Sequence, residues 1–398
     1  MKITSTRSSK RSSKRSTAPT RSSSSTVQPQ NFNRMISNLF QQVQLKRPSK
    51  NGPDYESSFS SIQQFSQRIS DESKQSINCI IFNAEKSDGI LSAYAAWRYA
   101  KDHQQHHNIR LLGGKPASGS QVDFRLKKME SDLRGKVILV LDISYSDANM
   151  RYLEQIGKTV YQIDDHSAEE RNIMLDRRFI GTNHAACAYT WKFYYPDQPV
   201  PRFIQYIDSD DHKLFLPTTP HTSLFAITMG IRYGHLKTRN YVPIMEELHD
   251  LVQEDKPEMF IVIGYYYDQI RASLVKQIAI NYQVRSFQGY RVGILNFGSP
   301  LLSKPVGREI VEMAKQNGDD IDFVVLWLYE YSANGYRLDL IADHSPRYKG
   351  PKLNVMAREL GKRGGHPRGG DGTPNGWKGN FYWPKNAQHD IWELFDTA

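Results

Sequence analysis

The sequence contains only two cysteines, Cys79 and Cys187, and both lie in apolar stretches. Neither belongs to a zinc-binding spacing, so we expect buried thiols in a reducing compartment and no disulfide framework. No run of about 18 consecutive apolar residues is present, which argues against a membrane-spanning helix or a membrane partner. The basic N-terminus is not followed by an apolar signal-peptide core. We therefore expect an intracellular protein, cytoplasmic or nuclear, and not a secreted one.

Acidic residues are missing from the start of the chain. Residues 1–53 contain eleven Lys or Arg and no Asp or Glu. The whole chain has 52 basic and 42 acidic residues, so the remainder carries 41 against 42 and is nearly neutral. The near-repeat SSKRSSKRS, with Ser, Thr and Pro around it, predicts a disordered tail. Such an arm can bind nucleic acid, serve as a nuclear-import address, or only keep the protein in solution.

The body that follows the tail is long enough for two domains, each with its own core. Three apolar runs, at residues 77–82, 136–144 and 158–164, are predicted to be buried strands. Helical spacing follows the first two of them, at residues 88–102 and 147–157. This alternation of strand and helix predicts a parallel α/β sheet with right-handed crossovers.

Acidic side chains follow all three predicted strands. Asp88 comes after the first, Asp142 after the second, and Asp164, Asp165 and His166 after the third. A single Asp in such a place is more often a helix cap or a turn residue. Three of them at the carboxyl edge of one sheet would repel each other unless a cation neutralised them. Carboxylates suit Mg²⁺ or Mn²⁺, and an added imidazole favours Mn²⁺.

A fourth acidic cluster follows the apolar run at residues 202–207. It contains Asp208, Asp210 and Asp211. The alternative interpretation is a solvated acidic turn with His212 as a bystander.

The second half of the chain contains further predicted strands, at residues 290–297 and 321–330, and a predicted helix at 304–318. A later segment, GGHPRGG, is a loop in which glycines allow the backbone to approach a ligand closely. Donors that suit a phosphate surround it, namely Arg363, His366 and Arg368. By itself a basic Gly-rich loop can also be merely flexible.

Three successive tyrosines stand at residues 265–267. Tyrosine rings can stack nucleobases. Buried packing between two domains is the interpretation that we favour for them.

The order of these motifs resembles the DHH phosphoesterase family over about residues 77–371. SDGILSA resembles the family's first motif, LVLDIS the second, IDDHSA the Asp-His-His signature and YIDSDDHKLFLP the fourth. Residues 256–316 resemble the family's linker helix and the start of its DHH-associated C-terminal domain. KLNVMARELGKRGGHPRGG resembles the Gly-Gly-His motif of that domain.

The resemblance implies an α/β protein of two domains, a parallel-sheet DHH domain and a smaller C-terminal α/β domain joined by a helical linker. It implies a divalent-metal-dependent phosphoesterase that uses Mn²⁺ or Mg²⁺. The implied substrates are short oligonucleotides, cyclic dinucleotides or related nucleotides. The expected segments are a tail at 1–53, a DHH domain at 54–235, a linker at 236–286, a DHH-associated domain at 287–385 and a terminal helix at 386–398.

The resemblance also implies roles for individual residues. The implied catalytic residues are Asp88, Asp142, Asp165, His166 and Asp211. The implied metal ligands are Asp88, Asp142, Asp164, Asp165 and Asp211. The candidate substrate contacts are Lys86, Arg363, Gly364, Gly365, His366 and Arg368.

Four positions depart from the family pattern. Asn83 or Phe82, and Lys86, stand where the first motif has metal ligands, and Asp165 replaces the first His of the signature. Ile341 stands where a phosphate-binding Arg is expected. One metal could then remain, with Lys86 substituting electrostatically for a second. Alternatively, catalysis is lost and the protein only binds nucleotide or nucleic acid. A third hypothesis is a nucleic-acid-packaging protein that works through its basic tail. The oligomeric state is not predicted.

Overall fold

The computed structural model of the chain describes most of the body. The described residues are 55–115, 122–166, 173–212, 220–234, 238, 240–299, 302–331, 334–343, 350–365, 370–372, 376–387 and 390–395. The basic tail therefore lies outside the described residues, as do His366 and Arg368. Within the described part of the chain, no helix combines the length and the apolar character needed to cross a membrane.

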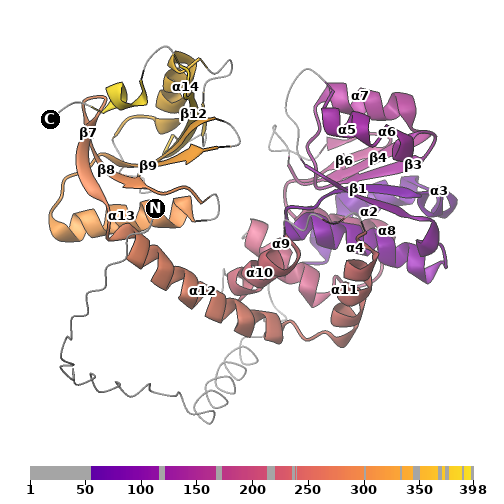
Figure 1. Cartoon of the computed structure of the whole chain (residues 1–398). Coiled ribbons are helices and arrows are strands. Elements are labelled where there is room, and N and C mark those ends of the chain that lie inside the picture. Colours follow the sequence, from indigo (N-terminus) through magenta and orange to yellow (C-terminus); the bar gives the residue numbers. More distant parts are fainter. Residues whose placement is uncertain are drawn as a thin grey trace, which may run out of the picture. The chain divides into compact units, whose positions relative to one another are not determined.

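The first sheet has the strand order β2-β1-β3-β4-β6-β5 (Figure 1). Neighbouring strands are parallel except for β5, which runs antiparallel to β6. The strands are β1 (Cys79–Asn83), β2 (Arg110–Gly114), β3 (Val137–Leu141), β4 (Thr159–Asp164), β5 (Ile173–Met174) and β6 (Arg178–Ile180). The predicted parallel α/β sheet is confirmed.

Apolar residues explain why these segments form the centre of the sheet. Every residue of β1 and β3 is buried, because both faces of the sheet are covered by helices. On one face, side chains such as Leu133 and Leu153 pack against Ile138 and Val140. Figure 1 shows α5, α6 and α7 on this face, and α2, α4 and α8 on the other. The helices are α2 (Ser60–Arg68), α4 (Ser87–Asp102), α5 (Phe124–Lys128), α6 (Glu130–Leu133), α7 (Asp147–Ile156) and α8 (Ala186–Tyr194).

Further helices follow α8 along the chain. They are α9 (Arg202–His212), α10 (Pro220–Tyr233), α11 (Val242–Glu254) and α12 (Glu258–Ala279). Helix α10 packs along α12, and a glycine makes their close approach possible. A Cβ at Gly264 would lie only 2.0 Å from the carbonyl oxygen of Leu224. The first described segment forms a short 3₁₀ helix, η1 (Ser57–Phe59), ahead of α2, and α3 (Asp71–Gln75) follows α2.

The second sheet has the strand order β11-β12-β10-β9-β8-β7. Only β8 and β9 are parallel, and α13 (Ser303–Asn317) forms the crossover between them. Helix α14 (Leu353–Arg363) contributes Leu353, Ala357 and Leu360 to one core of this sheet. The strands are β7 (Gln283–Phe287), β8 (Tyr290–Asn296), β9 (Phe323–Glu330), β10 (Gly335–Ile341), β11 (Asp371–Gly372) and β12 (Lys378–Pro384).

Some elements differ from the sequence-based expectation. Strand β2 was not predicted, because it is short and only partly buried and ends in two glycines. The expected terminal helix is a single 3₁₀ turn, η3 (Ile391–Leu394), with a capping box between Asp390 and Glu393. Cys79 and Cys187 are free and buried, as expected.

Candidate metal centre

The topology of the first sheet brings the acidic motifs to one place. The chain leaves β1 through α4 to reach β2 on one side of β1, whereas β3 lies on its other side. In parallel α/β sheets, ligands bind at such a switch point, outside the carboxyl ends of the strands. Asp88 lies in the first turn of α4, and Asp142 directly follows β3. Asp164 is the last residue of β4.

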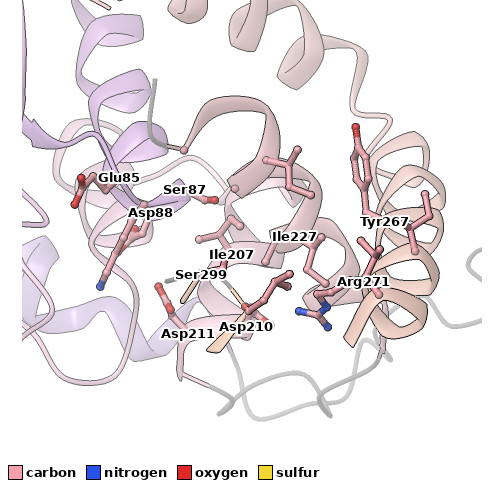
Figure 2. Close-up of a pocket in the computed structure, with 18 residues that line it drawn as sticks. Glu85, Ser87, Asp88, Ile207, Asp210, Asp211, Ile227, Tyr267, Arg271 and Ser299 are labelled. Atoms are coloured by element: carbon pink, nitrogen blue, oxygen red, sulfur yellow. The ribbon is translucent and has the colours of Figure 1, made fainter. Parts of the chain in front are cut away.

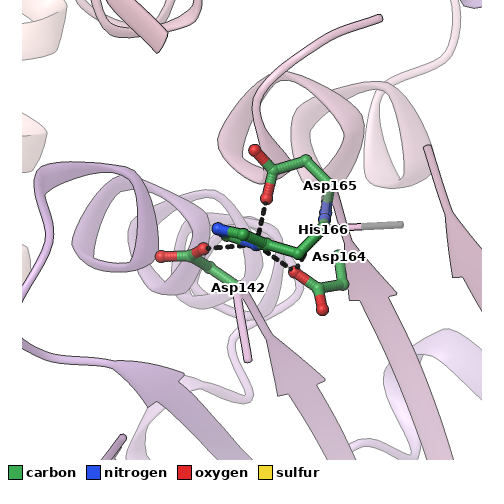
Figure 3. Close-up of side chains that lie close together, drawn as sticks. All are labelled: Asp142, Asp164, Asp165 and His166. Atoms are coloured by element: carbon green, nitrogen blue, oxygen red, sulfur yellow. Dashed lines mark hydrogen bonds and ion pairs between the residues drawn. The ribbon is translucent and has the colours of Figure 1, made fainter. Parts of the chain in front are cut away.

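The predicted ligands form two clusters that share one residue. In the first cluster, ligand atoms of Asp142, Asp164, Asp165 and His166 all lie within 4.8 Å of one another (Figure 3). In the second, the same holds for Asp88, Asp165 and Asp211, the last of which comes from α9. The structure therefore brings together all six residues, from four separate motifs, around Asp165.

Asp142 has the most unusual environment of the six. Its side chain is fully buried, and neither carboxylate oxygen has a hydrogen-bond partner among the described residues. Its backbone has a φ of +52°, a left-handed conformation that is uncommon for residues with a side chain, although Asp and Asn tolerate it best. Burial raises the pKa of its carboxyl to about 8, and the nearby Asp165 adds to the rise while Lys86 opposes it. An unpartnered buried carboxylate is costly, so its retention here requires a compensating group.

Asp164, in contrast, is fully engaged. One of its oxygens accepts a hydrogen bond from Ser144 Oγ at 2.8 Å. The other accepts from the backbone N–H of Asp165 at 3.0 Å and lies 2.9 Å from His166 Nδ1. These contacts fit a residue that fixes the ring of His166 better than one that is free to ligate a metal.

His166 is held among carboxylates. Its Nδ1 lies 2.9 Å from Asp164, 2.8 Å from Asp165 and 3.6 Å from Asp142, as the dashed lines in Figure 3 show. Hydrogen bonds to Asp164 and then to Asp165 raise the pKa of the imidazole to about 11. A positive charge is favourable at this point, which is the property that a cation site requires.

Lys86 supplies a second positive charge. Its Nζ lies 3.0 Å from His166 Nε2, so it faces a second donor when the imidazole is protonated and an acceptor when the ring is neutral with its proton on Nδ1. Burial alone would lower the pKa of Lys86, but the carboxylates of the two clusters, Asp142 and Asp211 first, raise it instead. The lysine therefore stays charged beside the acidic groups.

Asp88 has a structural partner as well as a place in the second cluster. Its two oxygens accept hydrogen bonds from the backbone N–H groups of Ala186 at 3.1 Å and Cys187 at 2.7 Å. The carboxylate thus caps the N-terminus of α8, where negative charge is favourable. Burial, followed by the charges of Asp142, Asp165 and Asp211, still raises its pKa well above the usual value. A carboxylate has enough lone pairs to cap a helix and ligate a metal together.

These donors fit a hard divalent cation. The two clusters contain five carboxylates and one imidazole, and the two oxygens of Asp142 have no hydrogen-bond partner among the described residues. Oxygen-rich sites with one imidazole suit Mn²⁺ or Mg²⁺.

The predicted contacts in the second sheet are described only in part. Arg363 is the last residue of α14, Gly364 follows it as the cap, and Gly365 has a φ of +87°. A Cβ at Gly364 would lie 2.8 Å from the ring of Trp383, so this glycine is required by packing. His366 and Arg368 lie outside the described residues.

Comparisons with known proteins agree with the topology. No family model matches the sequence. The DHH domain of a member of the s1p family of ribosomal proteins has a TM-score of 0.51 and 13% identity, with 89% of this chain and 94% of that one covered. The chain has the fold of a DHH domain.

Three further proteins are similar to this chain. A pGpG-specific phosphodiesterase from Vibrio cholerae has a TM-score of 0.43 at 13% identity, with 77% of this chain and 94% of that one covered. The exonuclease RecJ bound to manganese has a TM-score of 0.45 at 11% identity, with 81% and 90% covered. An uncharacterized protein of Acanthamoeba polyphaga mimivirus is 23% identical over 157 residues, 38% of this chain and 37% of the relative's length.

The DHH fold also contains a buried network that the sequence did not suggest. Asp208 accepts hydrogen bonds from Tyr55 Oη at 2.7 Å and from the N–H of Ala185 at 2.6 Å, and it lies 2.8 Å from His184 Nδ1. His184 Nε2 in turn lies 2.7 Å from Ser58 Oγ. Asp208 therefore belongs to this network and not to either metal cluster, although the sequence placed it beside Asp211. Periodicity along α9 is the signal that could have separated them.

A cavity of about 830 Å³ opens beside the second cluster (Figure 2). Asp88 and Asp211 line it together with residues of α10 and α12. Tyr267 is among them and is 39% exposed, and Tyr265 and Tyr266 are only half-buried, so the predicted burial of the three tyrosines is wrong.

Proposed function

We propose that this protein is a divalent-metal-dependent phosphoesterase that acts on short oligonucleotides, cyclic dinucleotides or related nucleotides. The observation that carries the proposal is the buried carboxylate of Asp142, which has no hydrogen-bond partner among the described residues. It lies beside Asp165, the residue common to both ligand clusters. A structural role leaves both oxygens of Asp142 without a hydrogen bond among the described residues, whereas a cation would satisfy them.

A metal would be held by Asp142 and Asp165 in the first cluster, with His166 beside them, or by Asp88, Asp165 and Asp211 in the second. A bound Mn²⁺ or Mg²⁺ supplies an activated water and neutralises charge on the non-bridging oxygens of a phosphoester.

The remaining groups would orient the ring of His166 and offset negative charge on the phosphates of the substrate. Asp164 accepts a hydrogen bond from Nδ1 of His166 and so fixes the ring. Lys86 adds an ammonium group next to the carboxylates, where it can contact a phosphate oxygen. The Arg363–Gly365 segment offers an arginine and a left-handed glycine, which suit a further phosphate. His366 and Arg368 stay candidate substrate contacts from the sequence.

Hydrolysis assays with matched aspartate variants test the proposal. Wild-type protein is incubated with di- to pentanucleotides and cyclic dinucleotides in Mn²⁺, in Mg²⁺ and in a chelator. We expect turnover that the chelator abolishes and that Asp165→Asn reduces by about a thousandfold or more, since each 1.36 kcal/mol of barrier is a factor of ten. Asp147→Asn is the control, because Asp147 is exposed in the first turn of α7 and belongs to neither cluster.

Two results would contradict the proposal. Turnover that persists in the chelator would remove the metal from the reaction. Binding of nucleotide without turnover in either metal would favour the alternative, a DHH-fold protein that binds nucleotide or nucleic acid without catalysis.

A further inference from the structure

One wall of the cavity beside the second cluster is apolar. Helix α12 places Tyr267, Ile270 and Leu274 on one face, at spacings of three and four residues, and α10 adds Ile227 and Ile231. Ile231 and Ile270 are 54% and 58% exposed, which is high for isoleucine in a folded chain. We refer to these five residues as the apolar wall. Figure 2 shows Tyr267 on α12 across the cavity from Asp88.

The charges of the cavity restrict what can occupy it. Its lining contains four carboxylates, Glu85, Asp88, Asp210 and Asp211, against two cations, Lys86 and Arg271. Arg271 forms an ion pair with Asp268, one turn away on α12. One metal ion can offset the acidic excess at the Asp88 end but adds no charge along the apolar wall. A chain of phosphates would therefore find only Arg271 there, which is already paired with Asp268, whereas a flat apolar group would be favourable.

A glycine in α10 leaves room in the cavity. Gly230 lies in the interior of the helix, where glycine is less favourable than alanine. A Cβ at Gly89 or Gly264 would collide with a backbone oxygen, at 2.2 Å and 2.0 Å. A Cβ at Gly230 would meet nothing closer than Ser87 Oγ at 3.9 Å, on the cavity side. Packing therefore explains the first two glycines but not Gly230.

From these observations we infer that the apolar wall binds the nucleobase of a phosphoester whose phosphate lies at the Asp88–Asp211 end of the same cavity. Tyr267 stacks on the base, and Gly230 provides the space that the nucleoside occupies. The cavity volume of about 830 Å³ is in the range that encloses small organic ligands. The inference rests on the proposed function, and it commits the substrate class to nucleotides and excludes linear polyphosphates.

Binding measurements on the full chain test the wall separately from catalysis. The probe is a dinucleotide with a hydrolysis-resistant phosphorothioate linkage, titrated calorimetrically in the presence of Mn²⁺. Base–aromatic stacking predicts that Tyr267→Ala weakens binding about tenfold. Met259→Ala is the matched control, because Met259 is an exposed apolar residue of α12 that does not line the cavity. We expect it to bind as the wild type does.

A second variant fills the space instead of removing a contact. Gly230→Leu should weaken dinucleotide binding more than tenfold while the melting temperature stays equal or rises, because leucine is a better helix former than glycine. In steady-state assays, Tyr267→Ala should raise KM for a normal dinucleotide with kcat changed less than threefold. Tripolyphosphate should be neither bound nor hydrolysed.

The outcomes distinguish the inference from the function on which it rests. If the wild type hydrolyses dinucleotides but Tyr267→Ala and Gly230→Leu bind the probe normally, only the inference is wrong. It is also wrong if tripolyphosphate is used as well as a dinucleotide, or if the two variants change only the oligomeric state in size-exclusion chromatography. If nothing is hydrolysed but both variants lose the probe, the base-binding wall stands and the catalytic proposal fails.

Discussion

Two buried aspartates of the first domain have opposite surroundings. Asp208 is surrounded by donors, from Tyr55, Ala185 and His184, and every one of its contacts lies within the protein. Asp142 is as deeply buried but has no hydrogen-bond partner for either oxygen among the described residues. A carboxylate whose partners are all internal stabilises the fold, whereas one without them is available to a ligand.

The two aspartates also differ in backbone conformation. Asp208 lies inside the regular helix α9, with no unusual dihedral angle. Asp142 has a φ of +52°, which turns the chain sharply after β3. Strain of this kind is found most often at functional sites, where it aims a side chain. The comparison therefore assigns Asp142 to the candidate metal centre and Asp208 to the scaffold.

The largest expected effect comes from Asp142→Asn, which keeps the side-chain shape and tolerates the left-handed backbone well. Calorimetric titration should show Mn²⁺ binding lost or weakened at least a hundredfold, because an amide replaces a charged ligand. Hydrolysis should fall about a thousandfold, equal to about 4 kcal/mol of barrier. The metal-free variant should unfold at the same temperature as wild type or higher. Normal Mn²⁺ affinity in this variant would break the comparison.

The sequence predicted where Asp142 lies, but neither its left-handed backbone nor its lack of hydrogen-bond partners. An apolar strand followed by an acidic residue, repeated after β1 and β4, was enough to place Asp88, Asp142 and Asp164 at one sheet edge. The left-handed turn and the missing partners at Asp142 depend on which side chains arrive from other segments. No periodicity in one segment encodes that information.

For Asp208, the sequence-based grouping itself was wrong. The sequence grouped it with Asp210 and Asp211 because they are adjacent in the chain. Helical spacing places Asp208 one turn after Ile204, on the buried face of α9. Its partners Tyr55 and His184 lie more than 20 positions away, so their contact could not be predicted. The open space beside Gly230 could not be predicted for the same reason, because it depends on the position of Ser87 in another helix.

The second prediction tests whether Asp208 stabilises the fold and does not bind metal. Asp208→Ala leaves the buried donors of Tyr55, Ala185 and His184 without their acceptor, and each such loss costs about 1–3 kcal/mol. We expect the free energy of unfolding to fall by about 3 kcal/mol in urea titrations. Mn²⁺ affinity, measured below the melting temperature, should change less than threefold. A selective loss of metal with unchanged stability would reverse the two assignments.

The smallest expected effect is the pH dependence of stability that Asp142 causes. The pKa of Asp142 is raised to about 8, above its ordinary value near 4, so the folded state holds this proton more tightly than the unfolded state. The stabilisation that results is complete below about pH 4 and is lost as the pH rises through about 8. The stability of metal-free wild type minus that of Asp142→Asn should therefore fall by on the order of 2 kcal/mol from pH 6 to pH 8. Saturating Mn²⁺ should reverse this trend for wild type only, because the cation binds the ionised carboxylate and gains affinity as the proton leaves. A difference that stays constant with pH, in the absence and presence of Mn²⁺, would mean that Asp142 is already compensated within the protein, as Asp208 is.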